Sequence, residues 1–202
     1  MHAAMKKQSR SVVVDRQRVT KAILDSARTV ESLSTQTDGI AAICGAVIKA
    51  LKGGGKVLTA GHGGSAAEAL HMAEEFVGRF RHDRVSLPAI ALVADATALT
   101  CIANDFGLDQ LFSRQVEGLG KRGDILVLIS TSGNATNLTV ALKAAHARGM
   151  KVVCLLGRSG GALAGLGDYE IIVRGNATER VQEAHQVLIH LILDAVEEAY
   201  VP

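Results

Sequence analysis

The sequence contains no tryptophan, and aromatic residues make up only 3% of its 202 residues. Proteins that bind single-stranded nucleic acids stack the bases on aromatic side chains, which are scarce here. The net charge of +2 is also too small to attract nucleic acids or anionic membranes without specific contacts. The sequence therefore predicts no nucleic-acid partner and no membrane partner, and an anionic ligand would need a local binding site.

Cysteine is scarce as well. Cys44, Cys101 and Cys154 are odd in number, lie far apart and form no CxxC pair. This pattern argues against a disulfide framework and against a structural zinc site. Each cysteine stands among apolar neighbours, so we expect three thiols buried in the core.

No segment has the features of an export signal or a membrane span. Residues 1–18 are basic but lack an apolar stretch, and the longest apolar segment, residues 87–103, is interrupted by Pro88 and Asp95. We therefore expect a cytoplasmic protein.

The size and composition are those of an ordinary folded domain, with 48% hydrophobic and 21% charged residues. A chain of 202 residues is long enough to bury a substantial core but short for two domains. We predict a loose N-terminal tail over residues 1–14 and a single domain over residues 15–202.

Apolar residues recur at helical spacing near both ends of the chain and form short continuous runs between them. The helical patterns at the ends cover residues 15–33, 38–51 and 180–200. The short runs, which predict buried strands, cover residues 56–60, 89–93, 125–129, 152–156 and 170–173. Continuous apolar strands that alternate with helices are typical of parallel sheets covered on both faces. We therefore predict a doubly wound α/β fold with a five-stranded parallel sheet flanked by helices.

Two of the predicted helices carry an apolar stripe, which we expect to be buried. The members of the two stripes are Ala66, Ala69, Leu70, Ala73, Phe76, Val77 and Phe80 in one helix, and Val181, Ala184, Leu188, Leu191 and Ala195 in the last one. Glu68 and Glu74 lie outside the first stripe, and we expect both at the surface.

A hydroxyl-rich turn, STSGN at residues 130–134, follows the apolar run at residues 125–129 and precedes a helical segment. Gly133 permits close approach of the backbone, and the helix N-terminus adds N–H groups and a positive dipole end. Asn134 or Thr136 is expected to cap the helix. The turn predicts an anion site, although such a cluster is equally typical of an ordinary turn with a helix cap.

The segment from Gly61 to Ser65 repeats this design, with a strand, a glycine-rich turn, a hydroxyl and a helix in succession. Its spacing matches neither the dinucleotide-binding GxGxxG motif nor the phosphate loop of nucleotide-binding proteins, so nucleotide binding is not indicated. Because ligands of doubly wound folds sit at the carboxyl ends of strands, we expect the two turns to converge on one anionic ligand.

Several segments together resemble the phosphoheptose isomerases of the sugar isomerase (SIS) domain family. They are the turns at residues 61–65 and 130–134, HMAEE at 71–75 with GRF at 78–80, ANDFG at 103–107, FSR at 112–114, and VQEAH at 181–185 with His190. The resemblance spans residues 15–200. It implies an aldose–ketose isomerase that converts sedoheptulose 7-phosphate into D-glycero-D-manno-heptose 7-phosphate through an enediol, for the biosynthesis of heptose and surface polysaccharides.

The resemblance also implies roles for individual residues. It assigns to substrate binding Ser65, Ser130, Thr131 and Ser132, which hold the phosphate, Asn104 and Asp105 near the sugar, and Gln182. It implies one Zn²⁺ ion per subunit, held by His71, Glu75, Gln182 and His190, with Glu75 and His190 as the catalytic acid and base. It further implies a homotetramer with N-terminal helices packed in the oligomer and active sites at subunit interfaces.

The spacing of these residues agrees with the implied chemistry. An aldose–ketose isomerase needs a base for a carbon-bound proton and an acid for the oxygens, which a carboxylate and an imidazole supply. His71 and Glu75, four residues apart, share one face of a helix, and Gln182 and His190 lie about two turns apart on the last helix. Taken singly, each residue is also typical of a solvated helix face.

Three positions depart from the usual pattern of the family, because His62 replaces asparagine, Ala135 replaces serine and Glu179 replaces aspartate. Ala135 offers no hydroxyl to the phosphate, although Thr136 next to it could compensate. His62 either crowds the sugar or adds a cation. The preferred sugar is therefore less firmly predicted than the type of reaction.

Three further residues keep alternative roles. His185 is either a second proton carrier or a structural residue. Arg79 and Arg114 either neutralise phosphate across an interface or are solvated or paired in salt bridges.

Two other functions are compatible with the sequence. One is a non-catalytic SIS protein that binds phosphosugars or associates with a replication initiator. The other is an isomerase of another ketose phosphate. The presence of His71, Glu75, Gln182 and His190 favours an enzyme.

Overall fold

A parallel sheet of five strands lies at the centre of the computed structural model, which describes residues 14–175 and 177–201. The strands are β1 (Val57–Gly61), β2 (Ala89–Ala91), β3 (Ile125–Ser130), β4 (Lys151–Gly157) and β5 (Tyr169–Val173), and their order in the sheet is β2-β1-β3-β4-β5. The predicted doubly wound fold and its five predicted strands are confirmed. Of the predicted tail, residues 1–13 lie outside the described residues.

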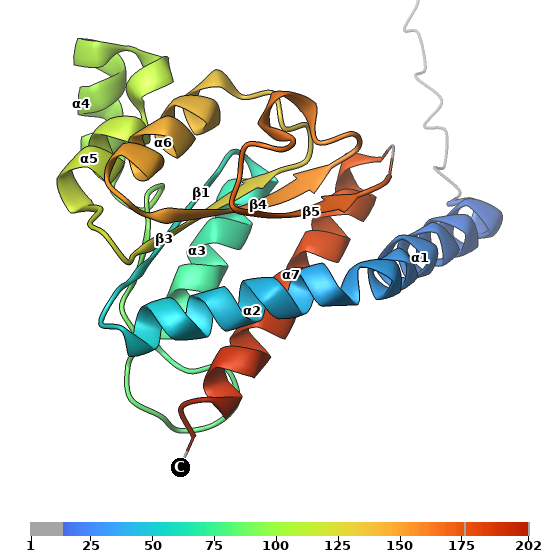
Figure 1. Ribbon diagram of the computed structural model, residues 1–202. Helices are drawn as coiled ribbons and strands as arrows, with labels where there is room; N and C mark the ends of the chain where they lie inside the picture. Colours follow the sequence, from blue (N-terminus) through green and yellow to red (C-terminus); the bar gives the residue numbers. More distant parts are fainter. Residues whose placement is uncertain (1–13, 176, 202) are drawn as a thin grey trace, which may run out of the picture.

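Helices cover both faces of the sheet, as Figure 1 shows. One face carries α2 (Thr37–Lys52), α3 (Gly64–Val77) and α7 (Thr178–Glu198), and the other carries α4 (Ala96–Phe106), α5 (Ser113–Leu119) and α6 (Thr136–Ala147). The chain begins with α1 (Arg16–Glu31), and the short 3-10 helices are η1 (Ser32–Gln36), η2 (Leu108–Gln110) and η3 (Gly161–Leu163). The predicted helices at residues 15–33, 38–51 and 180–200 correspond to α1, α2 and α7.

The central strand β3 shows why two layers of helices are needed. Ile125, Val127 and Ile129 join the core cluster under α2, α3 and α7, whereas Leu126 and Leu128 join the cluster under α5 and α6. Successive side chains of a strand point to opposite faces, so an apolar strand must be covered on both sides. The continuous apolar runs of the sequence therefore require the double cover.

The predicted apolar stripes are partly wrong. Leu70 and Val77 of α3 and Leu191 of α7 are exposed, whereas Met72 and Ile192 are buried. The reason is that α3 and α7 pack against each other as well as against the sheet. Their buried faces are therefore rotated toward the neighbouring helix.

The three cysteines differ in burial. Cys44 and Cys154 are buried, as predicted, but Cys101 is exposed, and none of the three forms a disulfide. The prediction for Cys101 was wrong because α4 buries only one residue, Ile102, and the neighbouring Cys101 lies outside its buried face. None of the helices within residues 14–175 and 177–201 has the length and apolarity that a membrane crossing needs.

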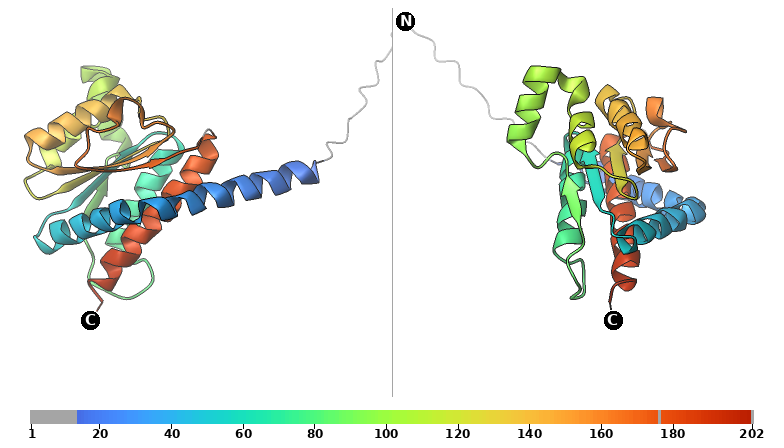
Figure 2. Two further views of the ribbon diagram at one scale, coloured as in Figure 1. Left: turned by 45° about the vertical axis from the view of Figure 1, so that its right-hand side comes forward. Right: turned by 60° about the vertical axis from the view of Figure 1, so that its left-hand side comes forward.

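The first helix extends away from the sheet, most clearly in the left-hand view of Figure 2. α1 has no buried residue, and its apolar side chains Val19, Ile23 and Leu24 are exposed. Its start is fixed locally, because the Asp15 side chain accepts a hydrogen bond from the backbone N–H of Gln17 at 2.9 Å. These three apolar side chains therefore have no cover in the single chain, whereas Val30 near the end of α1 packs against the core.

Candidate active site

Two glycine-containing turns meet where the strand order reverses. β1 lies between β2 and β3, so the connections that leave β1 and β3 run in opposite directions along the sheet. Ligands of doubly wound folds bind at the carboxyl ends of strands at such a switch point. Gly61, the last residue of β1, is in register with Ile129 of β3. The turns at residues 61–65 and 130–134 therefore converge, as the sequence predicted.

The turn after β3 is held by its own hydrogen bonds. The Ser130 hydroxyl oxygen accepts from the N–H of Gly133 at 3.0 Å, and the Ser132 hydroxyl oxygen accepts from the N–H of Asn134 at 3.3 Å. Gly133 has a φ of 65°, and a Cβ at this position would lie 1.8 Å from the carbonyl oxygen of Gly160. Since both serine oxygens act as acceptors, their hydroxyl hydrogens can be donated to a ligand.

The helix after this turn has no side-chain cap, contrary to the prediction for Asn134 and Thr136. The side-chain oxygen of Asn134 accepts instead from the N–H of Ala162 at 3.0 Å, and Thr136 is already the first helical residue. The N-cap position is occupied by Ala135, which has no side-chain oxygen. The first N–H groups of α6 are therefore available to an anion.

The turn after β1 also lacks a side-chain cap, but the N–H groups of Ser65 and Ala66 donate to the carbonyl oxygens of His62 and Gly63 at 3.0 and 3.1 Å. Its N-cap residue is Gly63, with a φ of 57° and no side-chain hydrogen bond to the helix. Ser65 lies in the first turn of α3 and is 3% exposed. The His62 Nε2 atom lies 2.8 Å from the Oδ1 atom of Asn137, which links this turn to the start of α6.

A second group of polar side chains lies between α3 and α7, which are neighbours in Figure 1. His71 and Glu75 come from α3, and His190 comes from α7; all three are partly buried. The ring centres of His71 and His190 are 5.4 Å apart, and Nε2 of His71 lies 3.2 Å from Oε1 of Glu75. The structure therefore brings three of the four predicted metal ligands together within one chain.

Gln186 lies between the two imidazoles. Its Nε2 atom is 2.9 Å from Nε2 of His190 and 3.3 Å from Nδ1 of His71. Because an amide nitrogen only donates, both of these ring atoms act as acceptors. His71 then carries its proton on Nε2, the atom nearest to Glu75. Sequence reasoning gave Gln186 no role, although its position four residues before His190 places the two on one face of α7.

Burial lowers the pKa of His190. The neighbouring His71 and Arg81 act in the same direction, whereas Glu75 opposes them. The ring of Phe80, centred 5.4 Å from that of His190, forms an apolar wall on one side. A lowered pKa favours the neutral imidazole, which is able to accept a proton near neutral pH.

Gln182 lies beside the start of α3, because a Cβ added to Gly64 would come within 1.9 Å of its Nε2 atom. Within residues 14–175 and 177–201, no three His, Cys, Asp or Glu side chains are arranged to hold a metal ion. The donor types of His71, Glu75 and His190 nevertheless suit zinc. The Nε2 atom of His71 is buried without a hydrogen-bond partner, and it would hold a metal ion once its proton is released.

Asn104 and Asp105, which the sequence predicts near the sugar, contact each other. Both are exposed near the end of α4, and the Asn104 amide donates to the Asp105 carboxylate at 2.7 Å. In the described part of the chain, no hydrogen bond joins either residue to the turns. Arg79 and Arg114 also have local contacts, since Arg79 forms a salt bridge within its own loop and Arg114 lies 3.7 Å from the ring centre of Phe106.

Two buried titratable residues lie between α3 and α7. Glu68 is 8% exposed and His185 is 0% exposed, with His185 Nδ1 at 4.0 Å from Glu68 Oε2. The prediction of a surface position for Glu68 was wrong because α7 packs on this part of α3. Burial raises the pKa of Glu68 to about 7, against the effect of a hydrogen bond from Ser65, and it lowers the pKa of His185 to about 4.

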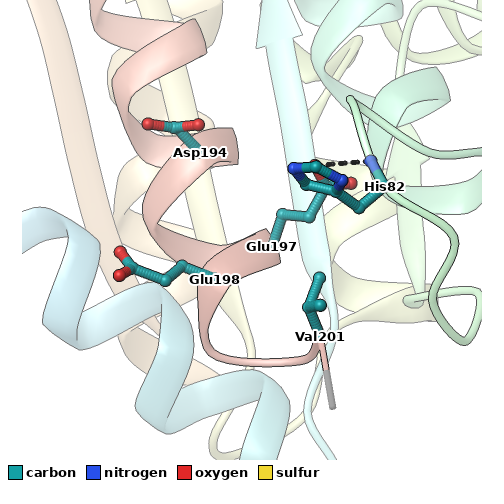
Figure 3. A pocket seen from close by; sticks show the side chains of 5 residues that line it. All are labelled: His82, Asp194, Glu197, Glu198 and Val201. Carbon is teal, nitrogen blue, oxygen red and sulfur yellow. Dashed lines mark hydrogen bonds between the residues drawn. The ribbon is translucent and has the colours of Figure 1, made fainter.

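The carboxyl-terminal ends of α3 and α7 are joined by a buried carboxylate. Glu197 accepts hydrogen bonds from the backbone N–H groups of Phe80, Arg81 and His82 at 3.0, 2.8 and 3.0 Å. Figure 3 shows Glu197 and its bond to His82 beside a hollow at this end of α7. Burial raises the pKa of Glu197, but the three N–H groups and Arg84 lower it by more, so that the pKa lies below its usual value.

Arg84 completes this junction. Its guanidinium donates to the backbone carbonyl oxygens of Glu75 at 2.6 Å and Phe76 at 2.8 Å, and its Nε lies 3.8 Å from Oε1 of Glu197. The backbone of Glu75 is thus tied to the end of α7. Sequence reasoning missed Arg84 and Glu197, because a single arginine and a single glutamate far apart in the sequence carry no recognisable spacing.

Comparisons with known proteins agree with this geometry. The family model of the SIS domain matches residues 23–157, which include both turns. A phosphoheptose isomerase from Geobacter metallireducens is 49% identical over 162 residues, covering 80% of this chain and 86% of that protein. The structure of the phosphoheptose isomerase from Neisseria gonorrhoeae aligns with a TM-score of 0.86 at 40% identity, over 91% of this chain and 98% of that chain. A phosphoheptose isomerase structure from Francisella tularensis aligns with a TM-score of 0.88 at 33% identity, over 92% of this chain and 100% of that chain.

Proposed function

This chain belongs to the SIS domain family and, within it, to the phosphoheptose isomerases, and we propose that it converts sedoheptulose 7-phosphate into D-glycero-D-manno-heptose 7-phosphate. The reaction is an aldose–ketose isomerisation that feeds heptose biosynthesis. The observation that carries the proposal is the combination of two uncapped turns at the switch point with a carboxylate and an imidazole on the adjoining helices.

The substrate's phosphate binds at the two turns. N–H groups at the starts of α3 and α6 and the hydroxyl groups of Ser65, Ser130, Thr131 and Ser132 donate to it, because neither helix start has a side-chain cap. Helix N-termini with unpaired N–H groups favour an anion through both hydrogen bonds and the helix dipole. This arrangement explains how a chain with a net charge of only +2 binds a phosphate dianion.

Glu75 and His190 move the protons. Glu75 takes the carbon-bound proton of the substrate and returns it to the neighbouring carbon, while His190 moves protons between the two oxygens of the enediol. His71 holds its Nε2 proton near the Glu75 carboxylate, and Gln186 orients both imidazoles. Asn104 and Asp105 contact the sugar only if a second subunit or a movement of α4 brings them to the turns.

We further propose that one zinc ion per subunit binds to His71, Glu75, Gln182 and His190. Zinc would supply polarisation of the substrate's carbonyl group. Gln186 occupies the His190 Nε2 atom, so zinc binding at this nitrogen would displace its amide. A neutral glutamine is a weak ligand for zinc, and occupancy is therefore expected to depend on the zinc concentration. Calorimetric titration with zinc checks this directly, because His190→Ala should abolish the binding heat.

We propose a homotetramer with active sites at subunit interfaces, working in the cytoplasm. Support for the oligomer comes from the uncovered apolar side chains of α1 and from exposed Leu70, Val77 and Leu191 on α3 and α7. Support for the cytoplasm comes from the three unpaired thiols. Sedimentation velocity on the purified protein tests the oligomer, and a monomer at micromolar concentration would contradict it.

The activity is tested by incubating the purified protein with sedoheptulose 7-phosphate and following the aldoheptose signal by NMR. Conversion is expected, and its absence with and without added zinc would contradict the proposal. Fructose 6-phosphate in a parallel incubation tests the alternative of another ketose phosphate. Binding of either sugar without conversion would favour the non-catalytic alternative.

A further inference from the structure

Ser65, Glu68 and His185 form a buried polar group at the start of α3. Ser65 and Glu68 are three residues apart, so they share one face of the helix. Ser65 is 3% exposed, Glu68 is 8% exposed and His185 is 0% exposed. The Oε2 atom of Glu68 and both ring nitrogens of His185 have no hydrogen-bond partner. Three groups that cost free energy to bury are therefore kept directly behind the phosphate turn.

The other elements that pack on α3 leave Glu68 without a fixed counter-charge. β1, β2 and β3 contact α3, and none of these strands contains a titratable residue. From α7, His185 lies 4.0 Å from Glu68, whereas Glu183 is paired with Arg180 at 3.0 Å. On α3 itself, the next titratable residue along the same face, His71, is paired with Glu75.

Burial lowers the pKa of His185 to about 4, so this imidazole is neutral near neutral pH and does not hold Glu68 in its ionised form. The same burial raises the pKa of Glu68 to about 7. Glu68 therefore changes its protonation near neutral pH, and small changes in its surroundings shift the balance.

The two protonation states of Glu68 leave Ser65 with opposite hydrogen-bonding capacity. An ionised carboxylate only accepts, so it takes the hydroxyl hydrogen of Ser65. A protonated carboxyl group donates to the Ser65 oxygen, and the Ser65 hydrogen can then be donated elsewhere. A phosphate dianion at the turn needs donors and favours the second state.

We propose that Glu68 is a positioning residue that takes up one proton when the phosphosugar binds and thereby directs the Ser65 hydroxyl toward the phosphate. In this step one proton passes from the solvent to the Glu68 carboxylate, and no covalent bond of the substrate changes. The inference rests on the proposed function, because it takes the phosphate to bind beside Ser65.

Proton uptake on binding is the direct test. Sedoheptulose 7-phosphate is titrated calorimetrically into the Glu75→Gln variant at pH 8, in two buffers with different ionisation enthalpies. The phosphate ester is already a dianion at this pH, because its second pKa is about 6. Glu68 is mostly ionised before binding, so an uptake close to one proton per site is expected. In the Glu75→Gln/Glu68→Gln variant the uptake should fall to near zero.

The affinity should follow the same pattern. Above pH 7 the variant that retains Glu68 should bind about tenfold more weakly for each further pH unit, because the protonated fraction falls in this proportion. With glutamine at position 68 the affinity should be nearly constant, since the amide donates to Ser65 at every pH. Ser65→Ala in the same background should remove the pH dependence although Glu68 is still present.

Binding without proton uptake in the Glu75→Gln variant would overturn the role of Glu68, whether or not the glutamine variant folds. Equal uptake with and without Glu68 would overturn it as well, because another group would then take the proton. Failure of the proposed function looks different: the unmodified protein would not convert sedoheptulose 7-phosphate, and no binding heat would be observed at any pH.

Discussion

The two ends of the α3–α7 pair treat their polar groups in opposite ways. At the amino-terminal ends, Gly63 gives α3 no side-chain cap, and Glu68 and His185 keep unpartnered buried atoms. At the carboxyl-terminal ends, the Glu197 carboxylate accepts three backbone N–H groups, and Arg84 donates to the last carbonyls of α3. One end leaves groups available to a ligand, and the other end uses its groups to hold the helices together.

This difference separates residues that serve function from residues that serve stability. Unsatisfied buried polar groups cost about 1–3 kcal/mol each. In the described part of the chain, the amino-terminal ends of α3 and α7 hold more such atoms than the carboxyl-terminal ends, where Nε of Arg84 is one. Glu75 lies between the two ends, because its backbone carbonyl is bound by Arg84 while its side chain faces His71. The predictions below change one side of this comparison at a time.

The largest effect is expected for Glu75→Gln. The amide cannot take the carbon-bound proton, so kcat should fall by about a hundredfold to ten-thousandfold. The unfolding free energy should change by less than about 1 kcal/mol, because the backbone contact to Arg84 is kept. Turnover measured by NMR and urea unfolding measured by circular dichroism check the two parts. The control is Glu74→Gln on the exposed side of α3, and an equal loss of kcat there would contradict the assignment.

Glu197→Ala should show the opposite profile. Removing the carboxylate leaves three backbone N–H groups without their acceptor and takes away the counter-charge that lies 3.8 Å from Nε of Arg84. A buried charge that loses its partner costs about 3–5 kcal/mol. Urea unfolding measures this loss. The matched control is Asp194→Asn one turn earlier on α7, whose carboxylate pairs with Arg81 at the surface and should change stability by less than about 0.5 kcal/mol. Equal stability losses would show that the junction has no special role.

The amino-terminal end of the α3–α7 pair was largely predictable from the sequence, whereas the carboxyl-terminal end was not. Parallel strands followed by glycine and hydroxyl residues produce turns at one edge of the sheet, so the convergence at Gly61 and Ser130 follows from local patterns. His71, Glu75 and His190 were identified through the family resemblance, and their common location required only that α3 and α7 be neighbours. Arg84 and Glu197 depend on the path of the loop between α3 and β2, which no local pattern encodes.

The errors have a common physical cause. Glu68 was expected at the surface and Leu191 in the core, because one apolar stripe was taken to define the buried face. Helices that contact both a sheet and another helix bury a wider and rotated face. The predicted cap of α6 was wrong for a related reason. The Asn134 side chain was expected to cap this helix, but its oxygen accepts instead from the N–H of Ala162, which lies far away in the sequence. Such contacts between distant segments appear only in the folded chain.

Glu68 and His185, the buried pair near the amino-terminal end of α3, predict opposite pH dependences of stability for two variants. The raised pKa of Glu68 makes its contribution to stability largest at low pH, and this contribution is lost as the pH rises from 4.5 to about 7. The lowered pKa of His185 makes its contribution largest above 6.5, and this is lost as the pH falls toward about 4. The two trends oppose each other in the unmodified protein.

Single substitutions should separate these trends. Between pH 4.5 and 6.5, Glu68→Gln should become more stable as the pH rises, and His185→Gln should become less stable. Each slope should reach at most about 1.4 kcal/mol per pH unit, the value for one proton. Urea unfolding of both variants at several pH values measures the slopes. Slopes of the same sign would contradict the assignment of a neutral buried pair.

The smallest effect is expected where an uncapped helix is given a cap. Ala135→Ser places a hydroxyl at the N-cap of α6, where it can accept from the N–H groups of the first turn, and should raise stability by about 0.5–1 kcal/mol. Asp95→Ala is the reverse change at α4, whose N-cap carboxylate accepts from the N–H groups of Thr97 and Ala98, and should lower stability by about 1 kcal/mol. Thermal unfolding of the ligand-free proteins gives both values. The Ala135→Ser gain should grow when sedoheptulose 7-phosphate is present, because the serine oxygen accepts from the N–H groups while its hydrogen is donated to the phosphate. A gain that is unchanged by the ligand would mean that the phosphate does not use the start of α6.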